Sequence, residues 1–187
     1  MQIDHYTLAR AVHLDAERTG YGHAYWISGG ERRHLVNLET DDCDCYVRTV
    51  RGQICKHLIR AMLAEAEPYS GTELSADELS SDDAIVLVAR NGKQLVGLGA
   101  FVMGGDRESE IKILYVAPEL RKQGIAVALM AKIVDASRRY GQRWLRAKCG
   151  AGNEAALGLL RKSRFKDSPP FGAYEQDPAT VFLEFAP

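Results

Sequence analysis

Three of the four cysteines in the chain stand together with a histidine in the segment CDCYVRTVRGQICKH, residues 43 to 57. One residue separates Cys43 from Cys45, and after nine intervening residues come Cys55 and His57, again separated by one residue. Zinc in proteins takes four tetrahedral ligands, often thiolates and imidazoles. Two of them could come from one tight turn and two from the start of a helix. The four residues therefore predict a zinc site.

The cysteines could instead be buried apolar residues or form a disulfide. Small buried apolar residues are unexpected in a stretch as polar as DDCDC, residues 41 to 45. Whether cysteines form a disulfide depends on the redox state of the compartment. The N-terminal MQIDHYTLAR has no apolar core of a signal peptide, and no apolar run approaches the roughly 18 to 20 residues that span a bilayer. We therefore expect a cytoplasmic protein without membrane contact, in which thiols stay reduced and clustered cysteines bind metal.

The spacing resembles the SWIM zinc finger, whose pattern is C-x-C followed by C-x-H. The likeness covers residues 21 to 66, because a hairpin is predicted before the cysteines and an apolar helix after them. The resemblance implies DNA or protein partners. Residues 31 to 60 hold six Lys/Arg against five Asp/Glu, and the chain has a net charge of −1, so charge does not favour DNA. A finger that grips nucleic acid and one that docks against the rest of the chain both remain open. The basic residues that could still share one face are Arg32, Arg33, Arg48, Arg51, Lys56 and Arg60.

A second candidate site lies in LYVAPELRKQGIAVALM, residues 114 to 130. Here a predicted strand ends, Pro118 interrupts it, and a helix begins near Gly124. Main-chain N–H groups and the positive end of a helix bind anions, and Gly124 and Ala126 keep bulky side chains away. Residues 118 to 148 hold eight Lys/Arg and two Asp/Glu, an excess that suits a polyphosphate ligand. An ordinary packing turn is the alternative.

The same turn resembles the acetyl-CoA motif of the GCN5-related N-acetyltransferases (GNAT), which reads Q/R-x-x-G-x-G/A after a strand and a V-x-P break. It stands here as Val116-Ala117-Pro118 followed by Arg121-Lys122-Gln123-Gly124-Ile125-Ala126. A second motif of that family is matched by Asn153, Ala156, Leu159 and Phe165. The likeness covers about residues 84 to 187. It implies acetyl-CoA as cosubstrate and direct transfer of the acyl group to an amine.

The resemblance also implies roles for single residues. The strand 111–116 would splay away from the strand 143–149 and leave room for the pantetheine arm. A main-chain N–H, that of Leu114 or Tyr115, would polarise the thioester oxygen, and Glu110 would be the base that deprotonates the amine. The cofactor contacts would come from Leu114, Tyr115, Val116, Arg121, Lys122, Gln123, Gly124, Ile125, Ala126 and Asn153.

The chain departs from the family pattern at two residues. Leu160 stands where many members have a tyrosine that returns a proton to the CoA thiolate, so another acid must fill that role. The candidates are Tyr174, Tyr140, Cys149 and water. Arg164 replaces a glycine near the end of the same helix, and we expect this change to affect only the helix end.

The elements that position these residues follow from periodicity and turn signals. Apolar residues three or four apart predict helices, β-branched runs predict strands, and Asn91-Gly92 predicts a hairpin turn. Strands alternating with helices in the second half predict an α/β (α+β) fold, a mixed sheet flanked by helices. The predicted helices are residues 4–17, 56–67, 75–80, 120–140 and 153–165, and the predicted strands are 24–28, 34–38, 84–103 (a hairpin), 111–116, 143–149 and 180–185.

Three segments are expected along the chain. Residues 1–66 would form the zinc finger with an N-terminal helix, 67–83 an acidic linker and 84–187 the transferase domain. The family normally has a strand and two helices before its second strand, and the linker is too short to hold them all. The transferase domain is therefore expected to lack some of them, and the N-terminal half could build that wall of the acceptor pocket.

The predicted function is an acyl-CoA-dependent N-acetyltransferase whose zinc finger recruits or shapes the acceptor. The acceptor amine could belong to a small molecule, a protein or a nucleic acid. Two alternatives stay open. One is a DNA- or protein-binding module that keeps the GNAT fold as a non-catalytic CoA-binding scaffold. The other is an acetyltransferase that acts on an amine of a nucleic acid or a modified base.

Overall fold

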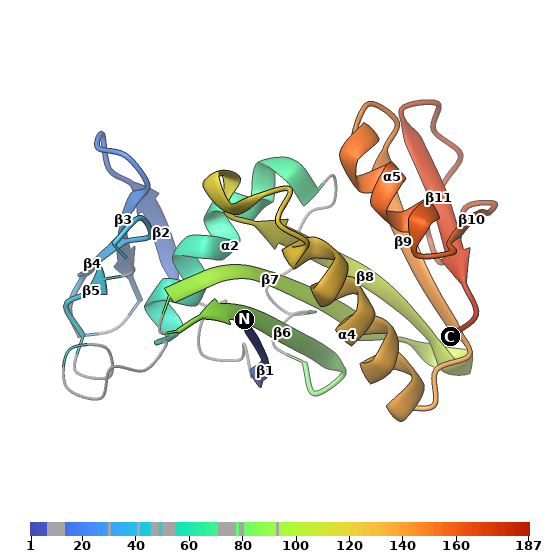
Figure 1. The fold of residues 1–187 in the computed structure, drawn as a ribbon, viewed down its shortest axis with the longest axis horizontal. Helices are drawn as coiled ribbons and strands as arrows, with labels where there is room; N and C mark the ends of the chain where they lie inside the picture. Colours follow the sequence, from blue (N-terminus) through green and yellow to red (C-terminus); the bar gives the residue numbers. More distant parts are fainter. Residues whose placement is uncertain are drawn as a thin grey trace.

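The computed structural model describes residues 1–6, 14–29, 31–40, 42–45, 49, 55–70, 78, 81–92 and 94–187. Two sheets and the helices around them make up this part of the chain (Figure 1). The large sheet consists of β1 (Gln2–Tyr6), β6 (Ala84–Asn91), β7 (Gln94–Met103), β8 (Glu108–Val116), β9 (Trp144–Gly150), β11 (Thr180–Phe185) and β10 (Lys166–Asp167), in that spatial order. The small sheet consists of β2 (Asp15–Arg18), β3 (Ala24–Ser28), β4 (His34–Asn37) and β5 (Asp42–Cys43). The helices are α2 (Lys56–Ser70), α4 (Ile125–Arg139) and α5 (Glu154–Lys162).

The large sheet is buried on both faces, as the alternation of side chains along β6 shows. Val86 and Val88 belong to a core shared with α2, whereas Ile85 and Leu87 belong to a second core shared with α4. Successive residues of a strand face opposite sides of the sheet, so a continuous apolar run fills both cores. The mixed sheet with helices on its two faces confirms the predicted fold class.

α4 packs closely against β7 at two glycines. A Cβ at Gly97 would lie 2.7 Å from the carbonyl oxygen of Tyr115, and one at Gly99 would lie 2.9 Å from Cδ1 of Ile133. Ile133 and Leu129 of α4 are fully buried over this part of the sheet. Glycine is therefore required where the helix and the neighbouring strand approach β7, and this packing fixes α4 beside β8.

β8 lies at the centre of the large sheet and is antiparallel to β7 along most of its length. The register of this pairing shifts between Ala100 and Phe101, so that one extra residue of β8, Lys112, has no partner in the register. A bulge of this kind bends a strand and increases its twist. The bend falls among the residues that the sequence assigns to the active site.

On its other edge β8 is parallel to β9, and this pairing is short. It ends at Ile111 opposite Ala147, although both strands continue. β8 and β9 lie together at the lower right of Figure 1 and diverge from there. We refer to residues 112–116 of β8 and 148–150 of β9 as the fork. The fork confirms the splay expected from the sequence.

The helix predicted over residues 4–17 is wrong. Residues 2–6 form β1, which pairs with β6, and residues 15–18 form β2; residues 7–13 lie outside the described part of the chain. Without β1, the outer edge of the apolar strand β6 would present unpaired N–H and C=O groups. Pairing satisfies that edge, and this tertiary demand outweighs the helical spacing of the apolar residues.

The N-terminal part of the chain supplies elements that residues 84–187 lack, as the sequence allowed. β1 supplies a strand before β6, and α2 contacts β7 and β8 on one face of the sheet. Leu58 and Met62 of α2 share a core with residues of β6 and β8. α2 continues to Ser70, so the boundary predicted at residue 66 runs through a helix. The small sheet stands in the chain between β1 and α2.

The remaining elements lie close to their predicted positions. The hairpins β3–β4 and β6–β7 and the strands β9 and β11 are confirmed. α4 begins at Ile125 rather than near residue 120, because residues 118–120 form a 3₁₀ turn. The helix predicted near residues 75–80 lies largely outside the described residues. Of these six residues the structure describes Glu78, which is helical. Among the described helices, none is long and apolar enough to cross a membrane.

α5 is followed by a left-handed residue that is not glycine. Arg164 has a φ of 70°. Its N–H donates to the carbonyl of Arg161, and the N–H of Phe165 donates to the carbonyl of Leu160. These two bonds define a Schellman motif, and Phe165 and Leu160 share the core that usually accompanies it. Arg164 thus stands at the helix end, as the sequence predicted.

Replacing Arg164 with glycine should stabilise the protein by about 1 kcal/mol, because a left-handed residue with a Cβ costs roughly 1–2 kcal/mol and glycine relieves that cost. Unfolding in urea measures the difference. Arg164→Ala is the matched control, since it removes the same long side chain but keeps the Cβ. Equal stability of the glycine and alanine variants would contradict a backbone origin of the effect.

Candidate active site and metal centre

The first candidate site is the turn between β8 and α4. Gly124 has a φ of 83° and directly precedes α4, and Lys122 has a φ of 61°. Arg121, Lys122, Gln123 and Gly124 are exposed. The first turn of an α-helix leaves its N–H groups without intrahelical partners, and no side chain caps the start of α4. The main chain here can therefore bind an anion.

The side chains around this turn leave the main chain open. Ile125 is buried in the core between α4 and the sheet, and Ala126 is small and half-buried. A Cβ at Gly124 would meet no atom within 4 Å. Arg121 folds back onto the end of β8, where its Nε donates to the carbonyl oxygen of Val116 at 3.0 Å. A diphosphate can thus approach the amides of this turn without displacing a packed side chain.

Main-chain N–H groups along β8 alternate between the two neighbouring strands. The N–H of Ala117 donates to the carbonyl of Val96 in β7, so the N–H of Tyr115 also faces β7. The N–H groups of Leu114 and Val116 face the fork, where the pairing of β8 with β9 has already ended. Leu114 stays the candidate donor to a thioester oxygen. Of the two predicted donors, the N–H of Tyr115 faces β7, so that of Leu114 is the one that faces the fork.

Glu110 lies in β8 at the base of the fork, and its carboxylate has two partners. Oε1 accepts a hydrogen bond from the hydroxyl of Tyr174 at 2.9 Å, and Oε2 forms an ion pair with Nζ of Lys112 at 2.8 Å. Nζ of Lys112 also lies 3.2 Å from Oε1 of Glu78 and 3.4 Å from the Tyr174 oxygen. We refer to these four residues as the Glu110 cluster. The predicted base is therefore part of a built polar group.

The charges of the Glu110 cluster are set by its surroundings. Burial opposes the charged form of Lys112, whose side chain is 7% exposed, but the hydrogen bond and charge of Glu110 outweigh burial and raise the pKa of Lys112. Burial and then the charge of Glu110 raise the pKa of Tyr174. Nζ of Lys148 lies 4.1 Å from the centre of the Tyr174 ring, a cation–π contact. Within the cluster Lys112 is therefore an ammonium and Tyr174 a neutral phenol at neutral pH.

The other motif residues have structural positions. The side chain of Asn153 accepts a hydrogen bond from the N–H of Ala156 and caps α5; its contact with the pantetheine arm stays a prediction. Leu160 is buried in the core beneath α5. Cys149 is buried as well, and burial raises the pKa of its thiol. Tyr140 caps the C-terminus of α4, the end opposite the turn, and is 47% exposed.

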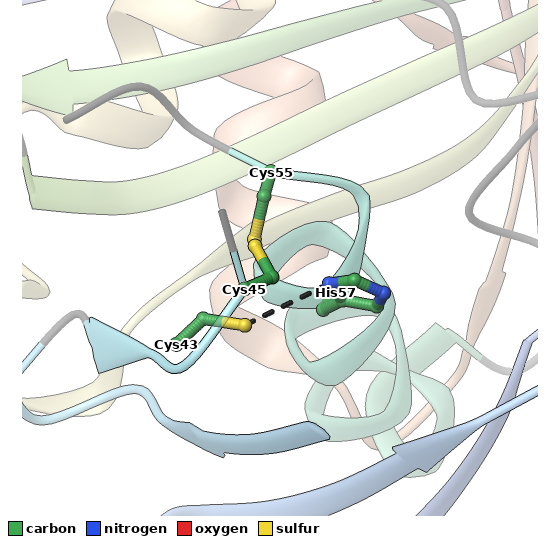
Figure 2. Close-up of side chains that lie close together, drawn as sticks. All are labelled: Cys43, Cys45, Cys55 and His57. Atoms are coloured by element: carbon green, nitrogen blue, oxygen red, sulfur yellow. Dashed lines mark hydrogen bonds between the residues drawn. The ribbon is translucent and has the colours of Figure 1, made fainter. Parts of the chain in front are cut away.

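The second candidate site is the group of Cys43, Cys45, Cys55 and His57, the Cys/His cluster (Figure 2). All four residues are buried, and their ligand atoms lie within 4.8 Å of one another. β5 and the turn after it supply the first two, and the start of α2 supplies the others. The predicted meeting of the four side chains is confirmed.

The Cys/His cluster fits a tetrahedral zinc ion. Bonds of about 2.3 Å to sulfur and about 2.0 Å to nitrogen place neighbouring ligand atoms about 3.5 to 3.8 Å apart. Sγ of Cys43 lies 3.7 Å from Nδ1 of His57. A hydrogen bond between Cys43 and Cys55 lowers the pKa of the Cys55 thiol to about 4 and raises the pKa of the Cys43 thiol. Zinc ligands must be deprotonated, so zinc binding would release the protons that the thiols still carry.

His34 and Asp44 surround this cluster. The ring of His34 stacks on the ring of His57 with centroids 4.1 Å apart, and Nδ1 of His34 lies 2.6 Å from Oδ1 of Asp44. Contacts of this kind fix the orientation of a metal ligand. His57 therefore packs against His34, a residue outside the Cys/His cluster that is itself held by Asp44.

The basic residues near the Cys/His cluster do not define a nucleic-acid face among the described residues. Arg33 pairs with Glu17, and Arg32 and Arg60 donate to main-chain carbonyl oxygens. Lys56 is the remaining described member of the six, and Arg48 and Arg51 lie outside the described residues. At least three of the six therefore have partners within the chain.

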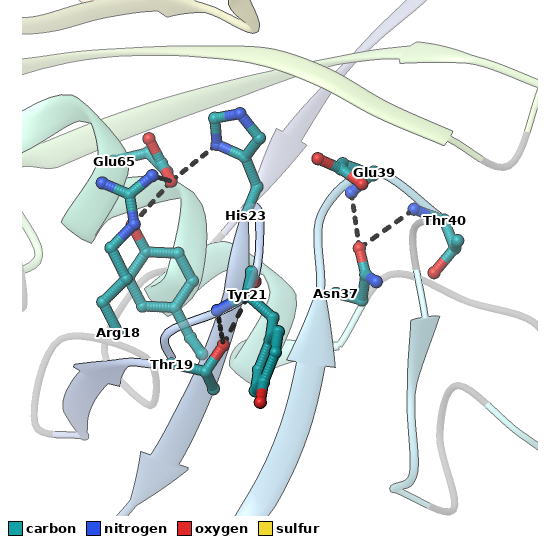
Figure 3. A network of polar contacts seen from close by, with 9 residues as sticks. Arg18, Thr19, Tyr21, His23, Asn37, Glu39, Thr40 and Glu65 are labelled. Carbon is teal, nitrogen blue, oxygen red and sulfur yellow. Dashed lines mark hydrogen bonds and ion pairs between the residues drawn. The ribbon is translucent and has the colours of Figure 1, made fainter.

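A polar network not predicted from the sequence joins the small sheet to α2 (Figure 3). Oε1 of Glu65 in α2 accepts from the hydroxyl of Tyr25 at 2.7 Å and lies 2.9 Å from Nδ1 of His23 and 3.6 Å from Arg18. Burial opposes the charge on Glu65, but the bonds to Tyr25 and His23 and the charges of His23 and Arg18 outweigh it and lower the pKa of Glu65. Burial and the bond to Glu65 raise the pKa of Tyr25. The network ties β3 to the helix that covers the large sheet.

The same network borders a small hollow at the end of β8. His23, Glu39 and Glu65 line the hollow from the N-terminal part of the chain, and Tyr115 and Glu119 line it from the transferase part. Its other lining residues are Leu38, Met62, Leu95, Ala117 and Pro118. The N-terminal part thus reaches the end of β8.

Comparison with known proteins agrees with this geometry. The family model described as "Acetyltransferase (GNAT) family" matches residues 51–165. An "IAA acetyltransferase" of Azospirillum brasilense is 34% identical over 114 residues, 59% of this chain and 73% of that protein. The "Uncharacterized N-acetyltransferase YedL" of Escherichia coli (strain K12) is 28% identical over 151 residues, 80% of this chain and 93% of that protein. A solved GNAT family acetyltransferase of Elizabethkingia anophelis with acetyl-CoA bound shares the fold, with a TM-score of 0.55 and 17% identity over 67% of this chain and 88% of that one.

Sequence reasoning missed Lys112, Glu65 and His23. A lone lysine inside the apolar strand IKILYV is a signal of a buried ion pair, because an unpaired buried charge is very costly. Glu65 follows His57 by eight residues, a spacing that keeps both on one side of α2. The partners of His23 are far away in the sequence, and nothing local marked that histidine.

Glu65→Gln should lower the free energy of unfolding by about 1–3 kcal/mol at neutral pH, because it weakens hydrogen bonds to a buried charge. The folded pKa of Glu65 is lowered from its ordinary value of 4.5. Its contribution is therefore complete above pH 4.5 and is lost as the pH falls through the folded pKa. Urea unfolding at several pH values measures this. Glu17→Gln, in an exposed ion pair, is the control and should change little; a pH-independent deficit in Glu65→Gln would contradict the assignment.

Proposed function

Because the chain belongs to the acetyltransferase (GNAT) family and is therefore an enzyme, we propose that it transfers an acetyl group from acetyl-CoA directly to the amine of an acceptor. The fork is the observation that carries this proposal. Its edge presents the N–H of Leu114 away from β7, the open start of α4 lies beyond one end, and the Glu110 cluster lies at the other. The N–H of Leu114 would serve the thioester oxygen, the start of α4 the diphosphate, and the Glu110 cluster the amine.

In this proposal the diphosphate of acetyl-CoA binds the main chain of residues 121–126. Exposure of this turn, the left-handed Gly124 and the uncapped start of α4 support that placement. The pantetheine arm extends along the free edge of β8, which offers it main-chain hydrogen bonds as a pairing strand would. The N–H of Leu114 then faces the thioester oxygen and stabilises the charge that develops there.

The chemical step needs orientation more than covalent help. Holding the amine in line with the thioester carbonyl replaces a bimolecular encounter by an intramolecular one. An alkylammonium acceptor must lose a proton before it attacks, and the carboxylate of Glu110 is the base. Its Oε2 lies 2.8 Å from Nζ of Lys112, so this carboxylate is held at the base of the fork by an ion pair.

The acceptor in this proposal lies between the fork and the N-terminal part of the chain. The packing of α2 against β8, with Leu58 and Met62 in one core with Ile113 and Tyr115, supports this placement. The amide donors and the base come from the transferase part, whereas the wall on the α2 side comes from the N-terminal part. The N-terminal part therefore selects the acceptor.

We infer further that the Cys/His cluster binds one zinc ion as a SWIM-type structural site. Three cysteines and one histidine, all buried, give a closed set of four ligands with no position for a substrate. Such an ion contributes to folding rather than to catalysis. It would fix the small sheet to the first turn of α2.

The function is tested by incubating the protein with labelled acetyl-CoA and a panel of small amines, peptides and nucleic acids, and by detecting the labelled product by mass spectrometry. Transfer to an amine is the expected result. Gly124→Asp places a negative charge at the proposed diphosphate site and should weaken coenzyme A binding about tenfold or more, a loss of at least about 1.4 kcal/mol. Calorimetry measures the affinity.

Gly141→Asp is the matched control for that variant. Gly141 also has a positive φ, of 69°, and open space around it, but it lies beyond the other end of α4. Backbone strain and added charge are then the same in both variants, and only the place differs. Equal affinity of the two variants for coenzyme A would place the diphosphate elsewhere.

Metal analysis of the purified protein should find about one zinc per chain, since four ligands complete a structural site. Cys43→Ser should abolish zinc binding and lower the thermal unfolding temperature, because ion binding is part of the folding free energy. Cys149→Ser removes the buried cysteine outside the cluster and should retain the zinc. A stable, well-folded protein without zinc would show that the cluster is not a metal site.

A further inference from the structure

The leaving CoA thiolate needs a proton, and α5 cannot supply it in this chain. Leu160 stands at the position of the family's tyrosine, is 6% exposed and packs in the core beneath α5. No acidic hydrogen is available there. If the proposed transferase reaction is correct, the proton donor must lie elsewhere along the fork.

The hydroxyl of Tyr174 already lies beside Glu110, the predicted base. It donates a hydrogen bond to Oε1 of Glu110 at 2.9 Å. Glu110 directly precedes Ile111, the last residue of β8 that pairs with β9 before the fork begins. The ring packs edge-on against Phe171, with centroids 5.4 Å apart, and beside Phe182 of β11. These contacts hold the phenol in one orientation, so its hydroxyl is positioned before any ligand binds.

We propose that Tyr174 gives its proton to the departing CoA sulfur and that Glu110 returns a proton to Tyr174. The inference rests on the proposed function and names a residue that family resemblance does not supply. The two groups are already joined by a hydrogen bond, so base and acid form one relay.

The proton balance of this relay closes. Glu110 takes one proton from the acceptor ammonium, and the neutral amine attacks the thioester carbon. As the carbon–sulfur bond breaks, its electron pair goes to sulfur, and the Tyr174 hydroxyl transfers its proton to that sulfur. The protonated Glu110 then gives its proton to the phenolate along the existing hydrogen bond. Amide and thiol leave, and the enzyme returns to its starting state.

The charges around Tyr174 suit both steps. Glu110 and Lys112 face it from β8, Lys148 faces it from β9, and Glu78 approaches through Lys112. Burial and the charge of Glu110 raise its pKa, so the hydroxyl is protonated in the resting enzyme and needs positive charges nearby to give up its proton. Lys112 and Lys148 then stabilise the brief phenolate. The ammonium of Lys112 thus positions both members of the relay.

Tyr174→Phe tests this inference because it keeps the ring and removes only the hydroxyl. Thiol release from acetyl-CoA is followed with the amine panel and with hydroxylamine, a small amine that is already unprotonated near neutral pH, after subtraction of the uncatalysed rate. We expect kcat to fall about 10²-fold or more, with the KM for acetyl-CoA and the affinity for coenzyme A unchanged. Tyr21→Phe, at a residue 86% exposed on the small sheet, should behave as the wild type.

A second measurement separates acid catalysis from a structural role. Raising the concentration of a buffer acid such as imidazolium at constant pH should increase the rate of Tyr174→Phe and leave the wild type unchanged. If the wild type is active and Tyr174→Phe keeps its rate, the relay is overturned. The relay is also overturned if Tyr174→Phe loses its rate and buffer acid does not restore it. In both cases the transferase proposal stands. A wild type that binds coenzyme A but releases no thiol with any acceptor overturns the transferase proposal, and the relay falls with it.

Discussion

β8 can position a cofactor only because it pairs on one edge and loses its partner on the other. The antiparallel ladder with β7 anchors the strand along most of its length, and the bulge at Lys112 bends it. The parallel ladder with β9 stops at Ile111. A free strand edge in the middle of a sheet normally invites pairing, so an extended ligand arm with amide groups is a natural occupant. The turn, the main-chain donor and the Glu110 cluster all take their positions from this strand.

The two helical layers keep that edge open without letting the sheet collapse. α4 packs on β7 through glycine contacts, and its start lies just beyond the end of β8. α2 covers the opposite face and shares a core with Ile113 and Tyr115 of β8. With both faces covered by apolar packing, β8 has little freedom to move toward β9. The donor groups are therefore held in place before a ligand arrives, which lowers the cost of orienting it.

Local sequence signals were sufficient where the structure is decided locally. The hairpin at Asn91-Gly92, the helix face of α4 and the spacing of the cysteines each need only neighbouring residues, and each was predicted correctly. β1 was missed because its strand form depends on the edge of β6, more than seventy residues away in the chain. The partners of Glu110 were missed for the same reason, since Tyr174 is 64 residues away. Hydrophobic periodicity is a property of one segment, whereas an edge strand or a buried ion pair forms only with a partner elsewhere in the chain.

The role of the N-terminal part follows from the length of α2. His57 of the Cys/His cluster and Glu65 of the polar network are eight residues apart, about 12 Å along one helix. A zinc ion at the first turn would fix the axis of α2, and Glu65 would carry that position to His23 and Tyr25 on β3. His23 and Glu65 line the hollow beside Tyr115. One helix thus connects the Cys/His cluster to the hollow at the end of β8, so a change at the cysteines would be felt at that hollow, although no cysteine of the cluster lines it.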